Sequence, residues 1–315
     1  MKKLSICIPT YNRSSLLLSQ LKFLNKEIQP FNDIVDVIVA DNLSDIDHRN
    51  KLINYHKQNC FFDLKLNEKN LGSIGNIYFL MSLVKSEYVW FVSDDDILLE
   101  GVIARLVQII STKPVNHIFL NHSAFIHDPN IIDHTVDLLG HNGYNDDGKQ
   151  SLIDLFVSNG TVSMFMTACV YSTSLLKSFC ASRPIQTLMD PLLFSFKLAD
   201  GPIFIEKDIF VLERCIGFSW INESLAIFSW QVQEGLIELL NNGYSRKDVL
   251  TMVNSSYISN RGNYLRMILQ APLKVKKNLI SFLGWSQFIL ILPSLFFNLK
   301  RVFINVIDIL KLRKK

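Results

Sequence analysis

The sequence Tyr88-Val89-Trp90-Phe91-Val92-Ser93-Asp94-Asp95-Asp96 joins a short apolar run to three consecutive carboxylates. An unbroken run of β-branched and aromatic residues predicts a buried strand, so the acidic triplet is expected at the carboxyl end of that strand. Parallel sheets bind ligands in the crevice at this end. Carboxylate oxygens favour Mg²⁺ or Mn²⁺, and Mg²⁺ is commonly held by one or two carboxylates together with substrate phosphates. The alternative is a solvated acidic turn ahead of a helix over residues 100–110.

Two earlier apolar strands also end in polar residues. Residues 4–8 predict a first strand, which Pro9 stops and Thr10-Tyr11-Asn12-Arg13 follow before an apolar-periodic helix. Residues 35–40 predict a second strand, which ends in Asp41-Asn42, and Asn70-Leu71-Gly72-Ser73-Ile74-Gly75-Asn76 opens another helix. This alternation predicts an α/β fold, with a doubly wound, mostly parallel central sheet flanked by helices.

Four of these segments, in this order, resemble the motifs of family 2 glycosyltransferases, which have the GT-A fold. They are Ile8-Pro9-Thr10-Tyr11-Asn12-Arg13, the strand end at Asp41, Asn70-Leu71-Gly72 with Asn76, and Ser93-Asp94-Asp95-Asp96, and they cover about the first 110 residues. The resemblance implies that a sugar is transferred from a nucleotide-diphosphate donor to an acceptor hydroxyl. It also implies inversion at the anomeric carbon and a requirement for Mn²⁺ or Mg²⁺.

The resemblance further implies a donor site. Thr10 and Tyr11 would line the nucleotide base, Asp41 would bond the edge of the base, and Asn76 would lie near the base or the diphosphate. The donor-binding residues implied are Thr10, Tyr11, Asn12, Arg13, Asp41, Asn70, Gly72, Asn76, Asp94 and Arg214.

The register of the acidic triplet on the metal stays open, because Ser93 stands where the family commonly has its first carboxylate. Either Asp94 or Asp95 would lie nearer the ribose, and Asp95 or Asp96 would bind the metal, with Asp95 preferred as the direct ligand. The cation would stabilise the negative charge that develops on the departing nucleoside diphosphate.

An inverting displacement needs a base that removes the proton of the acceptor hydroxyl. The resemblance places this base at the start of a helix in the acceptor half, where Asp190 stands in Met189-Asp190-Pro191 in place of the family's usual Glu-Asp pair. The alternative for Asp190 is a helix N-cap. Further on, residues 203–206 and 210–214 predict two short strands, and Arg214 would face the donor phosphates or form a structural salt bridge.

Around Trp220 the sequence Gly217-Phe218-Ser219-Trp220 lacks the arginine that processive polysaccharide synthases of this superfamily carry. Addition of a single sugar is therefore favoured over polymerisation.

Length and composition set the wider limits. At 315 residues the chain accommodates a catalytic domain over residues 1–220 and a helical region over 221–315. The catalytic domain would comprise a nucleotide-sugar-binding half, 1–110, and an acceptor half, 111–220. The net charge of +3 is too small to indicate a nucleic-acid partner.

Five widely spaced cysteines are typical of reduced core thiols, and the first apolar run is too short for a signal peptide. A cytoplasmic location is expected. The histidines between residues 117 and 141 match no compact zinc-ligand spacing. The polar segment 127–150 reads instead as a loop over the acceptor side.

The sequence of the C-terminal third suggests that this part of the chain contacts a membrane. Helical patterns over 223–241 and 246–270 precede residues 278–299, which contain no charged residue but are interrupted by Gly284 and Pro293. Three interpretations compete: attachment to the membrane surface, which is favoured, a packed helical hairpin, and a true span. Residues 301–315 add a basic, amphipathic end, so 273–315 is expected to contact the membrane surface peripherally or monotopically, on the inner face.

The resulting hypothesis is a metal-dependent, inverting glycosyltransferase. It would add one sugar to a saccharide or a lipid-linked acceptor in surface-polysaccharide synthesis, of O-antigen or capsule. A nucleotidyltransferase is one rival, although Pro9-Thr10-Tyr11-Asn12-Arg13 is not the glycine-rich basic signature that it needs after the first strand. A catalytically degenerate membrane-bound scaffold of the same fold is another.

Overall fold

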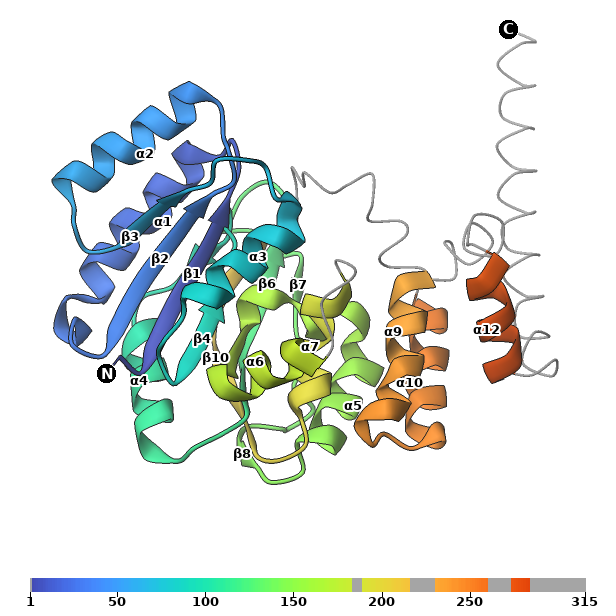
Figure 1. The fold of residues 1–315 in the computed structure, drawn as a ribbon. Helices are drawn as coiled ribbons and strands as arrows, with labels where there is room; N and C mark the ends of the chain where they lie inside the picture. Colours follow the sequence, from blue (N-terminus) through green and yellow to red (C-terminus); the bar gives the residue numbers. More distant parts are fainter. Residues whose placement is uncertain (1, 183–188, 216–229, 260–272, 284–315) are drawn as a thin grey trace, which may run out of the picture. The chain divides into compact units, whose positions relative to one another are not determined.

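The computed structural model describes residues 2–182, 189–215, 230–259 and 273–283 (Figure 1). The chain divides into two compact units, Met1–Gly217 and Phe218–Lys315. All the strands described lie in the first unit.

The first four strands run parallel, in the order β3-β2-β1-β4. Their bounds are Leu4–Thr10 for β1, Val35–Asp41 for β2, Asp63–Leu66 for β3 and Tyr88–Phe91 for β4. In the register of β1 and β2, Thr10 pairs with Asp41, so the two strands end level. β4 is offset, because Phe91 pairs with Cys7 and Val92 N–H donates to the carbonyl of Cys7 at 3.0 Å. The acidic triplet therefore continues alongside the last residues of β1.

The remaining half of the sheet makes it mixed rather than wholly parallel. β9 (Cys169–Ser172) lies antiparallel between β4 and β6 (His117–Phe125), and β10 (Ile203–Arg214) runs parallel to β6. Three short strands pair antiparallel along this half: β5 (Ile97–Leu98) and β8 (Gly143–Asn145) with β10, and β7 (His134–Thr135) with β6. The expected α/β class with a mostly parallel sheet thus holds, with antiparallel pairings in its second half.

The two short strands predicted at 203–206 and 210–214 are one strand, β10. The register only shifts beside Lys207 and Asp208, between Glu206 and Ile209 and again before Val211. Such irregularities absorb extra residues without ending a strand. As a result Arg214 sits at the end of a long strand anchored along β6.

Helices cover both faces of the sheet (Figure 1). On one face α1, α2 and α4 pack against the sheet, and Leu17, Leu21 and Leu24 of α1 are fully buried with Trp90 of β4 in one apolar cluster. On the other face lie α3, α6 and α7, with α5 beside α7. The bounds are Ser14–Glu27 for α1, Ile46–Gln58 for α2, Gly72–Leu83 for α3, Val102–Thr112 for α4, Gly148–Asn159 for α5, Thr173–Ser182 for α6 and Met189–Leu198 for α7.

Short 3₁₀ turns connect some of these elements: η1 (Gln29–Phe31), η2 (Gly160–Met164) and η3 (Met166–Ala168). The last of them is tied to the sheet, because the indole N–H of Trp90 donates to the carbonyl of Thr167 at 2.7 Å. All five cysteines are free, and Cys7, Cys169 and Cys180 are buried.

In the second unit the structure describes helices only: α9 (Val232–Glu238), η5 (Leu239–Asn242), α10 (Arg246–Ser259) and α12 (Leu273–Leu283). α9 packs on α10, where the side-chain amide of Gln233 donates to Ser256 Oγ at 2.9 Å. No helix within the described ranges has both the length and the apolar character needed to cross a bilayer. Of the predicted segment 278–299 only the part to residue 283 is described, within α12, and the basic end over 301–315 lies outside the described residues.

Candidate functional site

The carboxyl ends of β1 and β4 meet through a hydrogen bond between side chains. Thr10 Oγ1, at the last residue of β1, donates to Asp94 Oδ2 at 2.6 Å, and both residues are buried. Since Thr10 is also level with Asp41 across the β1–β2 pair, three strand ends form one polar edge. The sequence prediction that these residues lie together is confirmed.

Two carboxylates of the triplet converge on one positively charged atom. Arg13 Nη1 lies 3.2 Å from Asp94 Oδ1 and 2.6 Å from Asp95 Oδ2. The remaining oxygens accept from hydroxyl groups, Asp94 Oδ2 from Thr10 and Asp95 Oδ1 from Ser93. Asp94 and Asp95 therefore already bind a shared cation, which is supplied by the loop after β1.

The third carboxylate, Asp96, faces other partners. Its Oδ2 accepts from Thr167 Oγ1 at 2.6 Å, and its Oδ1 accepts from the main-chain N–H of Arg214 at 3.2 Å. Arg214 also donates from Nε to the carbonyl of Asp95 at 3.1 Å and lies 4.9 Å from the ring centroid of Phe125. Asp96 thus joins the triplet to η3 and to the end of β10, while Arg214 stands directly beside the triplet.

The residues fit a divalent cation shared with a phosphate ligand. Within the described residues no three acidic, histidine or cysteine side chains form a site that holds a metal on protein ligands alone. Two carboxylate oxygens that converge on one cationic nitrogen are, however, the donor set that Mg²⁺ or Mn²⁺ takes when phosphates complete the coordination. Asp94 and Asp95 form this point of convergence, and Asp96 makes neither contact.

Asp41 carries a buried acceptor that no described residue uses. Its Oδ2 forms an ion pair with Arg49 Nε at 2.9 Å and accepts from the main-chain N–H of Ser44 at 3.2 Å. Its Oδ1 is buried and has no hydrogen-bond partner within the part of the chain that the structure describes. Buried acceptors are nearly always paired, so this oxygen indicates a missing donor N–H or O–H.

An asparagine network holds the start of α3 against the end of β2. Asn42 donates from Nδ2 to Asn70 Oδ1 at 3.0 Å and to the carbonyl of Gly72 at 3.2 Å. Asn76 is buried, accepts from Asn67 at 2.9 Å and donates to the carbonyl of Ala40 at 3.0 Å. Asn70, Gly72 and Asn76 are thus brought to the predicted edge, with Asn76 beneath its surface.

The loop after β1 forms the outer rim. Tyr11 is 44 % exposed. Asn12 has a left-handed backbone, with φ of 56°, which asparagine tolerates better than most residues. Its main-chain N–H donates to Ser44 Oγ, and its side-chain oxygen accepts from the N–H of Asp45, both at 2.8 Å. These bonds fix the loop backbone to the end of β2.

Burial makes the carboxylates of this region hard to ionise. Burial raises the pKa of Asp94 to about 6, and it raises the pKa of Asp96 well above the usual range, with the neighbouring Asp95 adding to the effect. Burial, and then the charge of Asp95, raises the pKa of Glu213 to about 7. A bound cation would stabilise the ionised, negatively charged form of these carboxylates and so offset the effect of burial.

Glu213 has a histidine neighbour with which it forms no ion pair at neutral pH. His122 Nε2 lies 3.8 Å from Glu213 Oε2, but burial lowers the pKa of His122 to about 3. The imidazole is therefore neutral at pH 7.

Asp190 lies in the first turn of α7, which begins at Met189. A helix over these residues agrees with the sequence prediction, while residues 183–188, just before it, lie outside the described residues. The surroundings of its side chain lie outside what the structure describes, so its role as a base stays a prediction.

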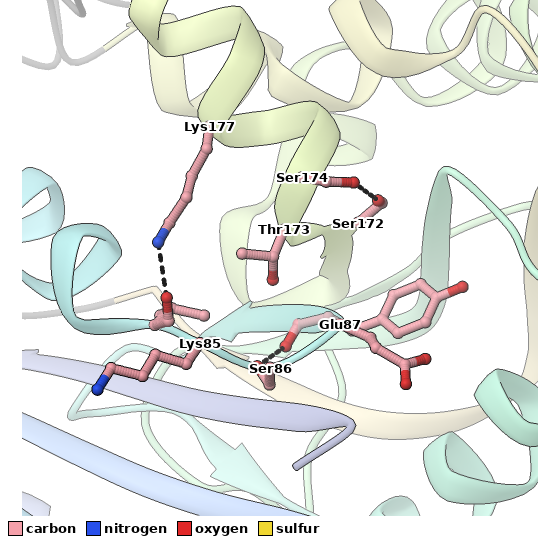
Figure 2. A pocket seen from close by; sticks show the side chains of 9 residues that line it. Lys85, Ser86, Glu87, Ser172, Thr173, Ser174 and Lys177 are labelled. Carbon is pink, nitrogen blue, oxygen red and sulfur yellow. Dashed lines mark hydrogen bonds between the residues drawn. The ribbon is translucent and has the colours of Figure 1, made fainter. Parts of the chain in front are cut away.

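A separate cavity, of about 630 Å³, lies at the opposite edge of the sheet, beside the amino end of β4 (Figure 2). It is lined by residues 84–88 and by 172–174 with Lys177, and Lys177 Nζ donates to the carbonyl of Val84 at 2.6 Å. None of the predicted site residues lines it. The cavity is thus distinct from the edge that carries the triplet.

Sequence reasoning missed several residues of the candidate site. Arg49 and Ser44 contact Asp41, Thr167 contacts Asp96, and Glu213 lies near Asp95. For Arg49 and Ser44 a signal existed, because both follow closely after the polar end of β2. For Glu213 a weaker signal existed, because it precedes Arg214 in a predicted strand, whereas for Thr167 none existed.

The family model described as "Glycosyl transferase family 2" matches residues 5–178. Two curated relatives each match a little over a third of this chain. "Abequosyltransferase RfbV" of Salmonella typhimurium is 32 % identical over 112 residues, 35 % of this chain and 33 % of the relative. "GalNAc(5)-diNAcBac-PP-undecaprenol beta-1,3-glucosyltransferase" of Campylobacter jejuni is 33 % identical over 122 residues, 38 % of each chain. The chain thus matches only about a third of the first relative's length and 38 % of the second's.

Solved structures resemble a larger part of the fold. TarS 1–349 of S. aureus, in complex with UDP-GlcNAc, has a TM-score of 0.65 at 16 % identity, and the match covers 90 % of this chain and 80 % of that chain. The mannosyltransferase PcManGT of Pyrobaculum calidifontis, in complex with GDP-Man and Mn²⁺, has a TM-score of 0.58 at 11 % identity, covering 93 % and 85 %. At these identities the likeness shows the fold alone, which is GT-A-like. Because the family model covers more than half of the chain, this protein belongs to glycosyl transferase family 2.

Proposed function

We propose that the protein is a metal-dependent, inverting glycosyltransferase that moves one sugar from a nucleotide-diphosphate donor to a saccharide or lipid-linked saccharide. The observation that carries this proposal is the convergence of Asp94 Oδ1 and Asp95 Oδ2 on one cationic atom, at the strand edge that also holds Asp41. Membership of the family supports the reaction class.

The donor base would be recognised by Asp41. Its unpartnered Oδ1 is a charged acceptor suited to an N–H on the edge of a nucleobase, while Arg49 and Ser44 hold the other oxygen in place. The exposed ring of Tyr11 offers a face on which a base could stack. Asn76 would act indirectly, by holding the backbone of β2 through Ala40.

The diphosphate would lie over the triplet. Asp95, with Asp94, would hold a Mn²⁺ or Mg²⁺ ion, and that ion would stabilise negative charge on the departing diphosphate. Arg214 is positioned beside the triplet by its bonds to Asp95 and Asp96, so its guanidinium can reach a phosphate oxygen. Asp96 would keep the triplet joined to β10 and η3.

Transfer needs removal of the acceptor proton on the face opposite the leaving group. We assign this step to Asp190, at the start of α7, whose carboxylate would accept the proton as the hydroxyl oxygen bonds the anomeric carbon. If so, Asp190→Asn keeps donor binding and loses transfer. An Asp190→Asn protein that transfers sugar at the parental rate would place the base elsewhere.

We further propose that the acceptor belongs to surface-polysaccharide synthesis, of O-antigen or capsule type, on the inner face of the cell membrane. The names of the two curated relatives support glycan synthesis, and that of the Campylobacter jejuni relative names an undecaprenol-linked saccharide. The basic, apolar segment 273–315 supports contact with the membrane surface.

The test is a panel of nucleotide sugars, screened with Mn²⁺ by thermal unfolding and then by release of nucleoside diphosphate. A ligand that binds only the folded protein raises the apparent unfolding temperature. One donor should stabilise the protein in the presence of Mn²⁺ and be hydrolysed slowly without acceptor. Asp95→Ala should abolish this metal-dependent stabilisation. Inertness towards every donor, with and without Mn²⁺, would instead favour a non-catalytic scaffold.

A further inference from the structure

We propose that Arg13 is the resident cation of the acidic site, bound between Asp94 and Asp95 in the donor-free protein and displaced when a divalent cation and a nucleoside diphosphate bind together. Metal and nucleotide would then bind cooperatively, because each ligand binds more tightly when the other is present. This inference builds on the proposed function and adds how its site is loaded.

Every carboxylate oxygen of Asp94 and Asp95 is already in use. Arg13 Nη1 contacts one oxygen of each, Thr10 Oγ1 takes the second oxygen of Asp94, and Ser93 Oγ takes the second oxygen of Asp95. The hydroxyl of Thr10 lies at the end of β1, and that of Ser93 lies directly before the triplet. A metal that needs the two converging oxygens must therefore take the place of the guanidinium.

Arg13 is also the member of this group that can leave. The side chain of Arg13 is 20 % exposed, whereas those of Asp94 and Asp95 are 6 % and 8 % exposed. The backbone of its loop is fixed, because Asn12 bonds both Ser44 and Asp45 at the end of β2. Displacement would consequently need only a rotation of the Arg13 side chain towards solvent, with no movement of the backbone.

Electrostatics explain why replacement of the Arg13 guanidinium by a divalent ion is favoured over loss of the guanidinium alone. Two buried carboxylates without a cation repel each other and lose the solvation that water would give. A divalent ion replaces the guanidinium with a larger charge, and a diphosphate supplies both additional metal ligands and an anionic partner for the released guanidinium. Nucleotide therefore lowers the cost of displacing Arg13, and metal alone does not.

The experiment measures Mn²⁺ binding without turnover, by the electron paramagnetic resonance signal of free Mn²⁺, in the full chain with and without saturating UDP or GDP. In the parent protein, the nucleotide that binds should tighten Mn²⁺ binding at least tenfold. Arg13→Gln should bind Mn²⁺ about tenfold more tightly than the parent without nucleotide, and should lose most of the nucleotide effect. Lys22→Gln, an exposed residue on α1, removes the same charge without touching the site and should match the parent.

A second measurement needs no destabilising change. In the parent protein, the nitrogen resonance of the Arg13 guanidinium, assigned through its loss in Arg13→Lys, should report restricted rotation without ligand and a new environment after Mg²⁺ and nucleotide are added together. Mg²⁺ alone at moderate concentration should leave it unchanged.

The outcomes separate the two proposals. If parent and Arg13→Gln bind Mn²⁺ and nucleotide with equal affinities and equal coupling, Arg13 is a fixed anchor, and only this inference is overturned. An Arg13 resonance that keeps its environment in the ternary complex overturns it as well. If no variant binds Mn²⁺ or either nucleotide, the proposed function fails, and this inference fails with it.

Discussion

Asp41 is a carboxylate with one occupied and one unoccupied oxygen inside the protein. A fully buried acceptor without a partner costs about 1–3 kcal/mol, so the fold retains it at the expense of stability. Because Arg49 and Ser44 hold the other oxygen, the unoccupied one points in a fixed direction. Such an oxygen is prepared for a ligand that donates an N–H group.

Asp41→Asn should therefore weaken nucleotide binding about 10- to 100-fold, because a hydrogen bond to a charged group is lost. The measurement is calorimetric titration of the parent and the variant with the nucleotide selected by the donor panel. Asp63→Asn removes the same charge from an exposed position on β3 and serves as the control. Equal affinities in Asp41→Asn and the control would remove Asp41 from base recognition.

Glu213 gives the metal-free protein a specific dependence on pH. Its folded pKa of about 7 lies above the ordinary value of 4.5, so between these values the folded state holds a proton that the unfolded state has released. Its contribution is complete below about pH 4.5 and is lost as pH rises through 7, by up to about 3 kcal/mol. Glu213→Gln should flatten this fall, measured as urea midpoints at pH 5 and pH 7.5 without metal. Glu68→Gln, an exposed carboxylate, should keep the parental dependence; a Glu213→Gln protein that also keeps it would contradict the assignment.

At the scale of elements, the start of α5 packs tightly against the segment before β10. A Cβ on Gly148 would lie 2.7 Å from the carbonyl oxygen of Gly201 and 2.9 Å from that of Ala199. Both atoms belong to the backbone just before β10, so neither can rotate away. The absence of a side chain at Gly148 lets α5 approach the segment that leads into β10.

Gly148→Ala should accordingly destabilise the protein by about 1–3 kcal/mol, the usual cost of overpacking. The free energy of unfolding in urea tests this. Ser158→Ala, at an exposed position of the same helix, is the matched control and should stay within about 0.5 kcal/mol of the parent. Equal stability of the two variants would mean that the backbone before β10 yields to the new methyl group.

Elements that form because of their own local sequence could be predicted, whereas elements that depend on pairing with distant segments could not. β1, β2 and β4 are buried apolar runs that polar residues terminate, so both the strands and the shared edge of Thr10, Asp41 and the triplet could be predicted. β3, with the sequence Asp-Leu-Lys-Leu, is short and partly exposed, and it carries no run of β-branched residues. β9 enters the sheet between β4 and β6 by tertiary pairing that no local pattern encodes. The contact of Arg13 with Asp94 likewise depends on a side-chain rotation fixed only after the strands assemble.

At the scale of the whole molecule, the first unit contains a complete mixed sheet with both faces covered, and the second contains helices. Every residue placed in the candidate site belongs to the first unit. The sequence features that suggest a membrane belong to the second, over 273–315. The residues of the candidate site and the residues predicted to contact a membrane thus belong to different parts of the chain.

Deletion of 278–315 should release the protein from membranes without loss of nucleotide binding. Basic residues near an anionic surface contribute about 1 kcal/mol each, so binding should require anionic lipid and weaken with salt. Co-sedimentation with vesicles, with and without anionic lipid, measures this. A full-length control with Lys311, Arg313, Lys314 and Lys315 changed to Gln should bind at an intermediate level. Equal sedimentation of deleted and full-length protein would refute the assignment of this segment.

The insertion of β9 beside β4 bears on how the protein is made. As the chain leaves the ribosome, β4 appears long before its neighbour, because the residues between Phe91 and Cys169 must first be synthesised. At about 5 to 20 residues per second, the hydrogen-bonding edge of β4 stays open for several seconds. During that interval the nascent chain presents an apolar strand able to pair with a neighbouring copy. Slower translation or scarce chaperones should thus lower its yield more than that of a protein whose sheet closes in chain order.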